Sequence, residues 1–217
     1  MMRFASVVFD VDSTLSGVEG IDWLAALREP ALAEEVRALT TRVMAGEIAI
    51  EEVFAKRLEA VGPSRSEVEM LGETYVARVA PDAQRVLADL QRAGVRVELV
   101  SAGLRPAVSM LATRLGVPDA CVHAVDVRFD SRGRFAGFDE ASPLARQHGK
   151  AEVVRSASLP RPILVVGDGS TDAAIKSEGA ADAFAAFVGF VRRSAVVELG
   201  DYVIESLAAV RELVLGE

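Results

Sequence analysis

The chain has 217 residues, enough for one domain or for one domain that carries an insert. Hydrophobic residues make up 51% of it and charged residues 26%, a composition that excludes intrinsic disorder, collagen and coiled coil. No apolar run reaches the roughly 18 residues of a membrane-spanning helix, and a net charge of −8 disfavours binding to nucleic acid or anionic membranes.

The N-terminal segment and the cysteine content indicate where the protein works. Asp10 comes too early for the apolar stretch of a secretory signal to precede it. The single cysteine, Cys121, cannot form an internal disulfide, which fits a reducing compartment. We therefore expect a cytoplasmic protein without membrane attachment, either a monomer or a homodimer.

Three short apolar runs, rich in β-branched residues, each end in polar or glycine residues. They span 6–9, 95–100 and 163–166, and their length and composition predict strands. The first and third lack clean alternation of apolar and polar residues, which indicates burial on both faces. Later apolar pieces at 182–185 and 202–204 are candidates for further strands at one edge.

Segments with helical spacing lie between these runs. One spans 82–92, after Pro81 and before Gly94, and others span 106–115 and 150–158. Strands that alternate with helices form a parallel sheet covered by helices. The sequence therefore predicts an α/β fold with a Rossmann-like parallel sheet as its core.

Residues 17–80 do not follow this alternation. Helical patterns, separated by glycine and proline, cover 22–45, 50–60 and 66–79. We interpret 17–80 as a helical cap inserted after the first strand, so that 1–16 and 81–217 form the core. A second, small insert at 123–140 contains DSRG at 130–133, which predicts the turn of a β-hairpin.

Polar clusters follow the predicted strands, where ligands bind in open α/β sheets. DVDST at 10–14 follows the first, Ser101 the second, and GDGSTD at 167–172 the third. Aspartate and serine also cap helices and form turns, so one cluster alone fits a structural role equally well. Two acidic clusters at one edge favour a site, because carboxylates so placed repel one another unless a divalent cation such as Mg²⁺ joins them.

A metal among carboxylates suits an anionic substrate, and phosphate is the usual one. Backbone N–H groups near Val11 and Asp12, and at Ala102 and Gly103, are candidate donors to phosphate oxygens. Lys150 precedes a predicted helix and would lie near the same edge, although a lone lysine is usually a solvated side chain.

These clusters resemble, in order, the four motifs of the haloacid dehalogenase superfamily: DVDST, Ser101, Lys150 and GDGSTD. Shorter stretches resemble its phosphoserine phosphatase family: EGID at 19–22, TRVM at 41–44, RL at 57–58, AGFDE at 136–140 and ADAF at 181–184. The resemblance implies a Mg²⁺-dependent phosphomonoester hydrolase. It further implies that O-phospho-L-serine is hydrolysed to L-serine and phosphate through an aspartyl-phosphate intermediate.

The resemblance also implies roles for the acidic residues. Asp10 would be the nucleophile, and Asp12 would protonate the leaving alkoxide and then take a proton from the attacking water. Mg²⁺ would be held by the side chains of Asp10 and Asp168 and by the backbone carbonyl of Asp12. Asp172 would act behind these ligands by orienting a water molecule.

Other matching residues would bind the substrate. Ser101 and Lys150 would hold the phosphoryl group, with Ala102, Gly103 and Thr171 beside them, although Thr171 is equally well explained as a small polar cap.

The cap would recognise the rest of the substrate. Glu19 matches the position that meets the ammonium group, Arg57 the one that grips the carboxylate, and Met44 would line the pocket. Each has a plain alternative: Glu19 as a solvated loop charge, Arg57 as an exposed helix residue, and Met44 as core filling.

Three positions depart from the family pattern. Ala102 and Ala45 stand where the family has glycine, and Ile50 stands where it often has an aromatic residue. An alanine keeps its N–H donor but loses access to positive φ. Because all three positions would touch the pocket, another small ester such as phosphohomoserine or phosphoethanolamine is an alternative substrate.

A phosphorelay receiver module is a remote alternative from another class of protein. It also places an acidic pair, a hydroxyl residue and a lysine around Mg²⁺. Such modules are shorter, at about 120 residues, and they lack the acid two positions after the nucleophile and the second acidic cluster. The two histidines, His123 and His148, suggest no site and are expected in loops or at an edge.

Overall fold

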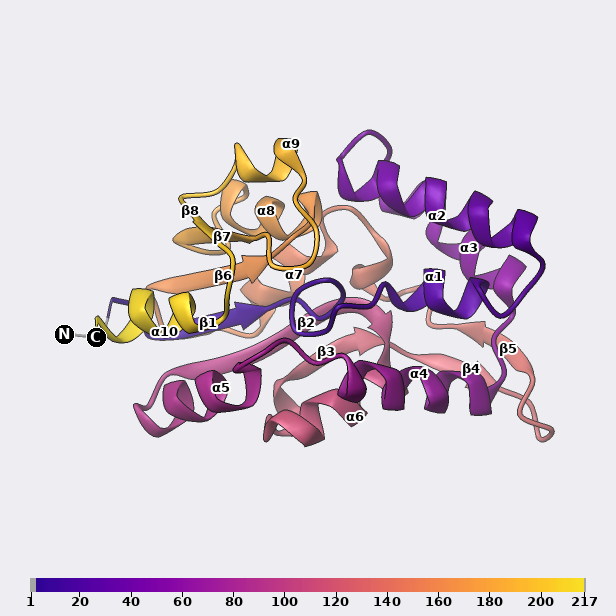
Figure 1. The fold of residues 1–217 in the computed structure, drawn as a ribbon, viewed down its shortest axis with the longest axis horizontal. Coiled ribbons are helices and arrows are strands. Elements are labelled where there is room, and N and C mark those ends of the chain that lie inside the picture. Colours follow the sequence, from indigo (N-terminus) through magenta and orange to yellow (C-terminus); the bar gives the residue numbers. More distant parts are fainter. Residues whose placement is uncertain (1–2, 217) are drawn as a thin grey trace.

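The computed structural model describes residues 3–216, which contain a six-stranded parallel sheet flanked by helices (Figure 1). The strand order is β3-β2-β1-β6-β7-β8, and every neighbouring pair is parallel. In this order the strands span Val122–Val125, Arg96–Leu104, Ser6–Phe9, Ile163–Gly167, Ala183–Phe187 and Tyr202–Ile204. The predicted α/β fold is confirmed, including the two edge strands proposed near the C-terminus.

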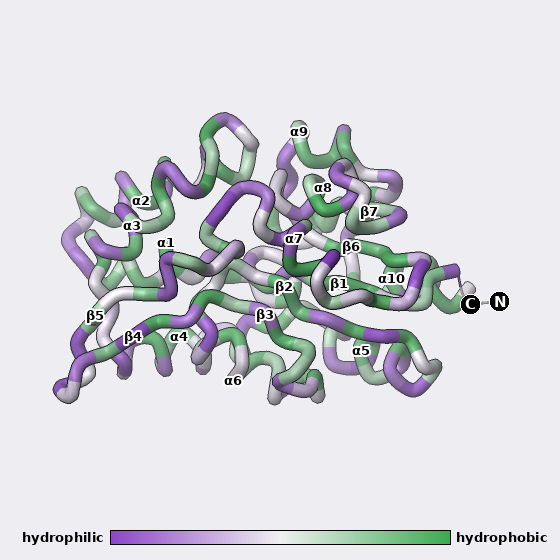
Figure 2. Tube along the Cα trace, turned by 180° about the vertical axis from the view of Figure 1, so that it is seen from behind, coloured by the Kyte–Doolittle hydropathy of each residue, from purple (hydrophilic) through white to green (hydrophobic). Residues whose placement is uncertain are grey.

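The centre of the sheet is buried because its strands carry apolar residues on both faces. Every residue of β1 and β6 is buried. Phe9 of β1 pairs with Leu99 of β2 on one side and with Val166 of β6 on the other. In Figure 2 the trace of β6 is coloured as hydrophobic. Asp10 follows Phe9 directly, so the register places it beside Gly167, the last residue of β6, which Asp168 follows.

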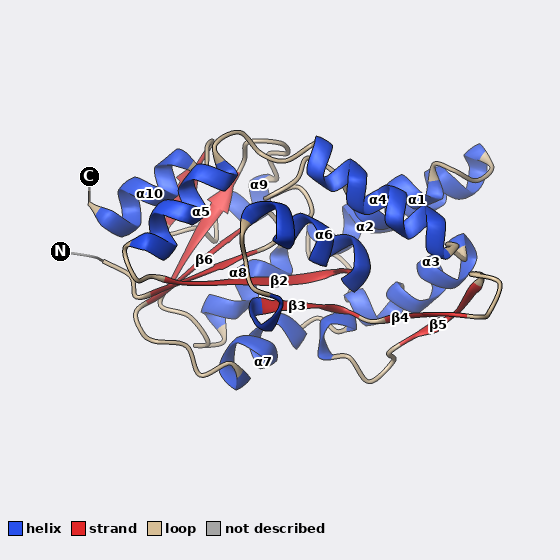
Figure 3. Ribbon diagram, turned by 90° about the horizontal axis from the view of Figure 1, so that it is seen from below, coloured by secondary structure: helices blue, strands red, loops and turns tan. Residues whose placement is uncertain are grey.

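Helices cover both faces of the sheet (Figure 3). Helices α5, α6 and α10 pack together on one face, and α7, α8 and α9 lie on the other. Their bounds are Ala83–Arg92, Arg105–Leu115 and Ala208–Leu215 for the first group, and Gly149–Ser156, Ser170–Ser177 and Ser194–Val197 for the second. Short 3₁₀ turns occupy Asp119–Cys121 and Pro143–Ala145. None of the helices within residues 3–216 has the length and apolar character needed to cross a membrane.

Four further helices and a 3₁₀ turn lie at the end of the molecule that the strands point toward (Figure 1). They are α1 (Gly20–Ala25), α2 (Pro30–Met44), the 3₁₀ turn Ile50–Glu52, α3 (Phe54–Val61) and α4 (Arg65–Ala77). The single helix predicted at 22–45 is wrong. The structure divides it before Pro30, because proline fits the first turn of a helix but cannot continue one. The limits of the cap at 17–80 stay a prediction.

The small hairpin is present but shorter than the predicted insert. Strands β4 (Val127–Phe129) and β5 (Phe135–Phe138) pair in antiparallel fashion around the predicted turn at 130–133. Strand β3, which adds an edge strand to the main sheet, was not predicted from the sequence. The start of the predicted insert at 123–140 therefore falls within β3.

Candidate active site

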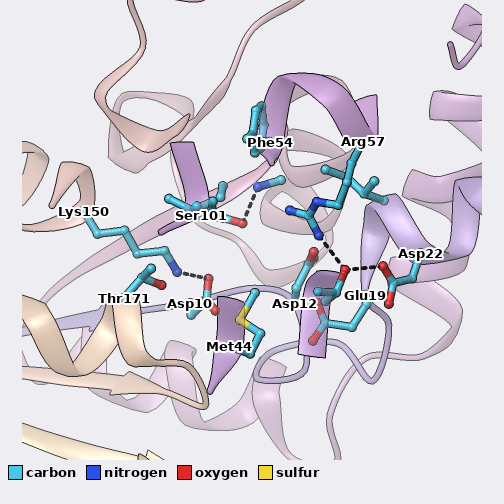
Figure 4. A pocket seen from close by; sticks show the side chains of 15 residues that line it. Asp10, Asp12, Glu19, Asp22, Met44, Phe54, Arg57, Ser101, Lys150 and Thr171 are labelled. Atoms are coloured by element: carbon cyan, nitrogen blue, oxygen red, sulfur yellow. Dashed lines mark hydrogen bonds and ion pairs between the residues drawn. The ribbon is translucent and has the colours of Figure 1, made fainter. Parts of the chain in front are cut away.

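The ends of β1 and β2, the starts of α7 and α8 and the cap helices surround one pocket (Figure 4). Its lining consists of Asp10, Asp12, Glu19, Ile21, Asp22, Thr40, Met44, Ile50, Phe54, Arg57, Ser101, Ala102, Gly103, Lys150 and Thr171. Every residue predicted from the sequence to be catalytic or to bind substrate is among them. Asp168 and Asp172 are buried next to Asp10 and do not line the pocket.

Three buried carboxylates form an acidic cluster beside the pocket. Asp10, Asp168 and Asp172 each offer an oxygen atom, and these atoms all lie within 4.8 Å of one another. The Thr14 hydroxyl donates to Oδ1 of Asp168 (3.2 Å), which ties the loop after β1 to the loop after β6. Oδ2 of Asp168 is buried and forms an ion pair with Arg193. This all-oxygen donor set is compatible with a hard divalent cation.

Lys150 supplies part of the positive charge that this cluster requires. Its Nζ lies 2.7 Å from Oδ1 of Asp10 and 2.7 Å from Oδ1 of Asp172, and its side chain is only 6% exposed. Burial alone would lower the pKa of Lys150, but Asp10 and Asp172 outweigh it and raise that pKa above its usual value. Burial and the charge of Asp10 raise the pKa of Asp172 to about 7, against the opposing effect of Lys150.

Arg193 is a second cation at the cluster, and it was not predicted from the sequence. Its guanidinium forms ion pairs with Oδ2 of Asp168 and with Glu19 (3.3 Å), and it donates to the Asp168 carbonyl at 3.2 Å. Arg193 lies in the segment after β7, immediately before α9. Because β7 is parallel to β6, this segment emerges at the same edge of the sheet as Asp168. Arg193 would have been identified if the order of the strands in the sheet had been known, but sequence patterns do not give that order.

Asp12 lies in a tight turn with both carboxyl oxygens occupied. The N–H of Gly20 donates to Oδ2 (3.0 Å), and the hydroxyl of Tyr75 donates to Oδ1 (2.5 Å). The turn includes Ser13 in the left-handed region, with φ of 52°. Burial of the carboxyl, with repulsion from Glu19, raises the pKa of Asp12 to about 8. Asp12 is therefore able to carry a proton near neutral pH.

Glu19 is oriented by two neighbours and is not a free loop charge. The hydroxyl of Ser13 donates to its Oε1 at 2.7 Å, and Arg193 pairs with the same oxygen. The carboxylate faces the pocket, and burial raises its pKa above the usual value. An anion held at this point would attract a cationic group of a ligand.

Arg57 and Asp22, labelled in Figure 4, are joined through the hydroxyl of Thr40. Nη1 of Arg57 donates to the Thr40 hydroxyl (2.5 Å), which donates to Oδ1 of Asp22 (2.5 Å). Arg57 is only 4% exposed, so the alternative of an exposed helix residue is excluded. Its Nε is buried with no hydrogen-bond partner in the described chain, which leaves a donor available to a ligand. Neither Asp22 nor Thr40 was predicted from the sequence to line the pocket.

The segment after Val100 differs from expectation. Strand β2 does not end at Ser101 but continues to Leu104, with a shift of register against β3. The Ser101 hydroxyl accepts the N–H of Gly103 (2.9 Å). A Cβ on Gly103 would lie 3.0 Å from that hydroxyl, so close approach, and not a positive φ, favours glycine there. Ala102 is not among the residues with positive φ, and alanine therefore fits without backbone strain.

The other two departures from the family pattern are also accommodated. Ala45 does not line the pocket, so the expectation that it would touch the pocket is wrong. It has an ordinary right-handed conformation (φ −77°), and Gly46 takes the positive φ (77°) that ends α2. Met44 and Ile50 line the pocket, where they supply apolar surface next to its charged groups. Thr171 is buried near the start of α8 and also faces the pocket.

The chain belongs to the haloacid dehalogenase-like hydrolases: the model of that family matches residues 7–175. Among curated proteins it resembles the chloroplastic phosphoserine phosphatase of Arabidopsis thaliana, with 36% identity over 92% of this chain and 68% of the relative. It also resembles the phosphoserine phosphatase of Bos taurus, with 34% identity over 95% of this chain and 93% of the relative. These relatives place it with the phosphoserine phosphatases of that family.

Solved structures share the fold. A phosphoserine phosphohydrolase-like protein from Francisella tularensis superposes with a TM-score of 0.89 at 24% identity, over 96% of this chain and 98% of that one. A substrate-bound phosphoserine phosphatase complex gives a TM-score of 0.80 at 24% identity, over 99% and 100% of the two chains. The similarity covers nearly the whole length of each protein, including the helices α1–α4.

Proposed function

We propose that the chain is a Mg²⁺-dependent phosphatase that hydrolyses O-phospho-L-serine to L-serine and phosphate. The observation that carries this proposal is the pocket itself. One end holds Asp10, Asp12 and Lys150, suited to phosphoryl transfer, and the cap contributes Glu19 and Arg57 to the same lining. Phosphoserine presents a phosphate, an ammonium and a carboxylate, and the pocket offers a complementary group for each of them.

Asp10 is the proposed nucleophile. Its carboxylate follows a buried central strand, and Lys150 holds Oδ1 at 2.7 Å. The buried ammonium of Lys150 reduces repulsion between the carboxylate and an incoming phosphate dianion. One carboxylate oxygen of Asp10 forms a bond to phosphorus while the bond from phosphorus to the seryl oxygen breaks. This gives an aspartyl-phosphate and a leaving alkoxide.

Asp12 is the proposed acid and base. Its carboxyl gives a proton to the seryl oxygen as the ester bond breaks, and the resulting carboxylate takes a proton from the water that attacks the aspartyl-phosphate. A pKa near 8 keeps the carboxyl protonated for the first step. Ser101, with Ala102, Gly103 and Thr171 beside it, would hold the phosphoryl oxygens.

The side chains of Asp10 and Asp168 and the backbone carbonyl of Asp12 would hold the Mg²⁺. When bound, the ion would neutralise charge on the transferring phosphoryl group. Asp172 fixes Lys150 together with Asp10, because Nζ contacts both carboxylates. We infer that Asp172 does not bind the metal itself and instead keeps Lys150 in place next to Asp10.

Recognition of the amino-acid portion is proposed to depend on the cap. The unpaired Nε of Arg57 is available to the carboxylate, and Glu19 is available to the ammonium. Met44 lines the apolar side between them. Asp22 and Thr40 hold Arg57 in place through consecutive hydrogen bonds.

A panel of phosphate monoesters assayed with Mg²⁺ tests the substrate. It includes L- and D-phosphoserine, phosphohomoserine, phosphoethanolamine and an aryl phosphate. The proposal expects kcat/KM for the L-serine ester to exceed the others by at least tenfold. Equal, low activity on all of them would contradict it, and a preference for phosphoethanolamine would remove Arg57 from recognition.

We further propose that the protein works in the cytoplasm as a monomer or homodimer. The single cysteine, which cannot form an internal disulfide, supports this environment. Light scattering measures the mass of the protein in solution. A value near 23 kDa is expected for a monomer and twice that value for a homodimer.

A further inference from the structure

Tyr75 connects the cap to the proposed acid of the core. It lies on α4, its side chain is 0% exposed, and its hydroxyl donates to Oδ1 of Asp12 at 2.5 Å. Its spacing from Val68 and Leu71 is that of the buried face of a helix. The sequence pattern alone would therefore class Tyr75 as core, where its ring is expected and its hydroxyl has no role.

The hydrogen bonds to Asp12 fix the orientation of its carboxyl group. The Gly20 N–H holds Oδ2 from the start of α1, and the Tyr75 hydroxyl holds Oδ1 from α4. A carboxyl held at one oxygen turns about the bond that joins it to Cβ, and a second donor on the other oxygen stops that rotation. Each oxygen keeps a further lone pair, so the group is still able to carry the proton that it transfers.

The surroundings of the phenol leave its hydroxyl little freedom. A Cβ on Gly20 would lie 2.2 Å from the Tyr75 oxygen, and a Cβ on Gly103 would lie 3.5 Å from it. The Ser16 hydroxyl donates to the backbone carbonyl of Tyr75 at 3.1 Å, which anchors this turn of α4 to the loop after β1. Gly20 thus provides the space in which the phenol reaches Asp12, whereas the distance at Gly103 is that of an ordinary contact.

We propose that Tyr75 is a positioning residue, whose hydroxyl holds the Asp12 carboxyl where it protonates the leaving group. This inference rests on the proposed function. In the step concerned, the bond from Asp10 to phosphorus forms and the bond from phosphorus to the ester oxygen breaks. The proton moves from Asp12 to that ester oxygen, and Tyr75 keeps its own proton throughout.

The test compares leaving groups in the Tyr75→Phe variant, which keeps the ring and removes the hydroxyl. Rapid-quench measurements give the rate of aspartyl-phosphate formation from phosphoserine, whose alkoxide needs a proton, and from 4-nitrophenyl phosphate, whose phenolate does not. We expect the phosphoserine rate to fall about 10-fold or more, part of the total contribution of a general acid. The 4-nitrophenyl phosphate rate is expected to change less than about threefold. Tyr202→Phe, at the sheet edge, is the matched control.

The ratio of the two rates on one preparation does not depend on the fraction of folded protein, so partial unfolding does not produce the result. A second variant, Gly20→Ala, keeps Tyr75 but forces its hydroxyl away from Asp12, and the same selective loss is expected. In an Asp12→Asn background, Tyr75→Phe should have no further effect on phosphoserine. Equal slowing with both substrates, or additive loss in the double variant, would overturn the inference. Inactivity of the parent toward phosphoserine would instead contradict the proposed function.

Discussion

A carboxylate oxygen of Asp10 lies within 4.8 Å of one of Asp168, although the two residues follow different strands. The proximity arises because β1 and β6 are neighbours in the sheet with their carboxyl ends in register. Thr14 reinforces it through its hydrogen bond to Asp168. Two acidic segments far apart in the sequence thus form one site, as the metal-binding proposal requires.

Asp168→Asn should weaken Mg²⁺ binding because it removes one ligand charge while keeping the shape of the side chain. We expect the Mg²⁺ affinity to fall at least about 10-fold, since even the loss of a residue that only hydrogen-bonds to a metal ligand lowers metal affinity by that much. Titration calorimetry of Mg²⁺ into the protein without substrate measures it. Asp182→Asn, an acid at the distant β6–β7 connection, serves as control. Equal Mg²⁺ affinity in parent and Asp168→Asn would exclude Asp168 as a ligand.

Asp12→Asn should slow both chemical steps, because the amide neither gives a proton to the alkoxide nor takes one from water. A loss of about 10²- to 10⁴-fold is expected with phosphoserine. Single-turnover formation and breakdown of the aspartyl-phosphate give the two rates separately. If both rates stay at the parent level, Asp12 has no acid or base role.

Arg57→Ala should raise KM for phosphoserine about 10- to 100-fold, the worth of a charge-assisted hydrogen-bonded pair. KM for an aryl phosphate without a carboxylate should change little. The matched control is Lys56→Ala, which removes the neighbouring cation on the exposed side of α3. Parallel increases in KM for both substrates would show that Arg57 supports the fold of the pocket and does not bind the carboxylate.

The Arg28–Glu67 pair predicts a pH dependence of stability. Arg28 donates to both Glu67 oxygens (2.7 and 2.8 Å), and Glu67 also accepts from the Ser64 N–H at the start of α4. The Arg28 guanidinium holds the pKa of Glu67 at about 2, below its usual 4.5. Because this pKa is lowered on folding, the contribution is complete above pH 4.5 and is lost as pH falls toward 2.

The measurement is the free energy of unfolding in urea, compared between parent and Glu67→Gln from pH 6 to pH 2.5. Glutamine keeps the helix-capping hydrogen bond but not the charge. The partly exposed pair should contribute about 1 kcal/mol at pH 6 and less at pH 2.5. Glu69→Gln, on the exposed face of α4, is the control, because it also replaces a glutamate by glutamine on the same helix. If the difference in the free energy of unfolding between parent and Glu67→Gln grows as the pH falls, the Arg28–Glu67 pair does not stabilise the fold in this way.

Much of the core was predictable because burial leaves a local signature. The strands around Val7 and Val165 read as continuous apolar runs, and the acidic residues that follow them were identified from position alone. The local sequence also indicates the break between α1 and α2, because a proline such as Pro30 does not continue a helix. The helix predicted at 22–45 should have been divided there.

The missed residues share a different cause. Arg193 meets Asp168 only because β7 is placed next to β6, and Tyr75 meets Asp12 only because α4 packs against the loop after β1. Thr40 acts through Asp22 and Arg57, which come from separate helices. These contacts depend on tertiary packing, and the spacing of residues along the chain does not predict them.

Trapping of the phosphoenzyme tests the central claim most directly. Protein mixed with phosphate-labelled phosphoserine and Mg²⁺ is quenched in acid, digested, and the labelled peptide is located by mass spectrometry. The account predicts a hydroxylamine-sensitive label on Asp10, and none in Asp10→Asn, which should also release phosphate at less than about 1% of the parent rate. A label on another residue, or rapid turnover by Asp10→Asn, would contradict it.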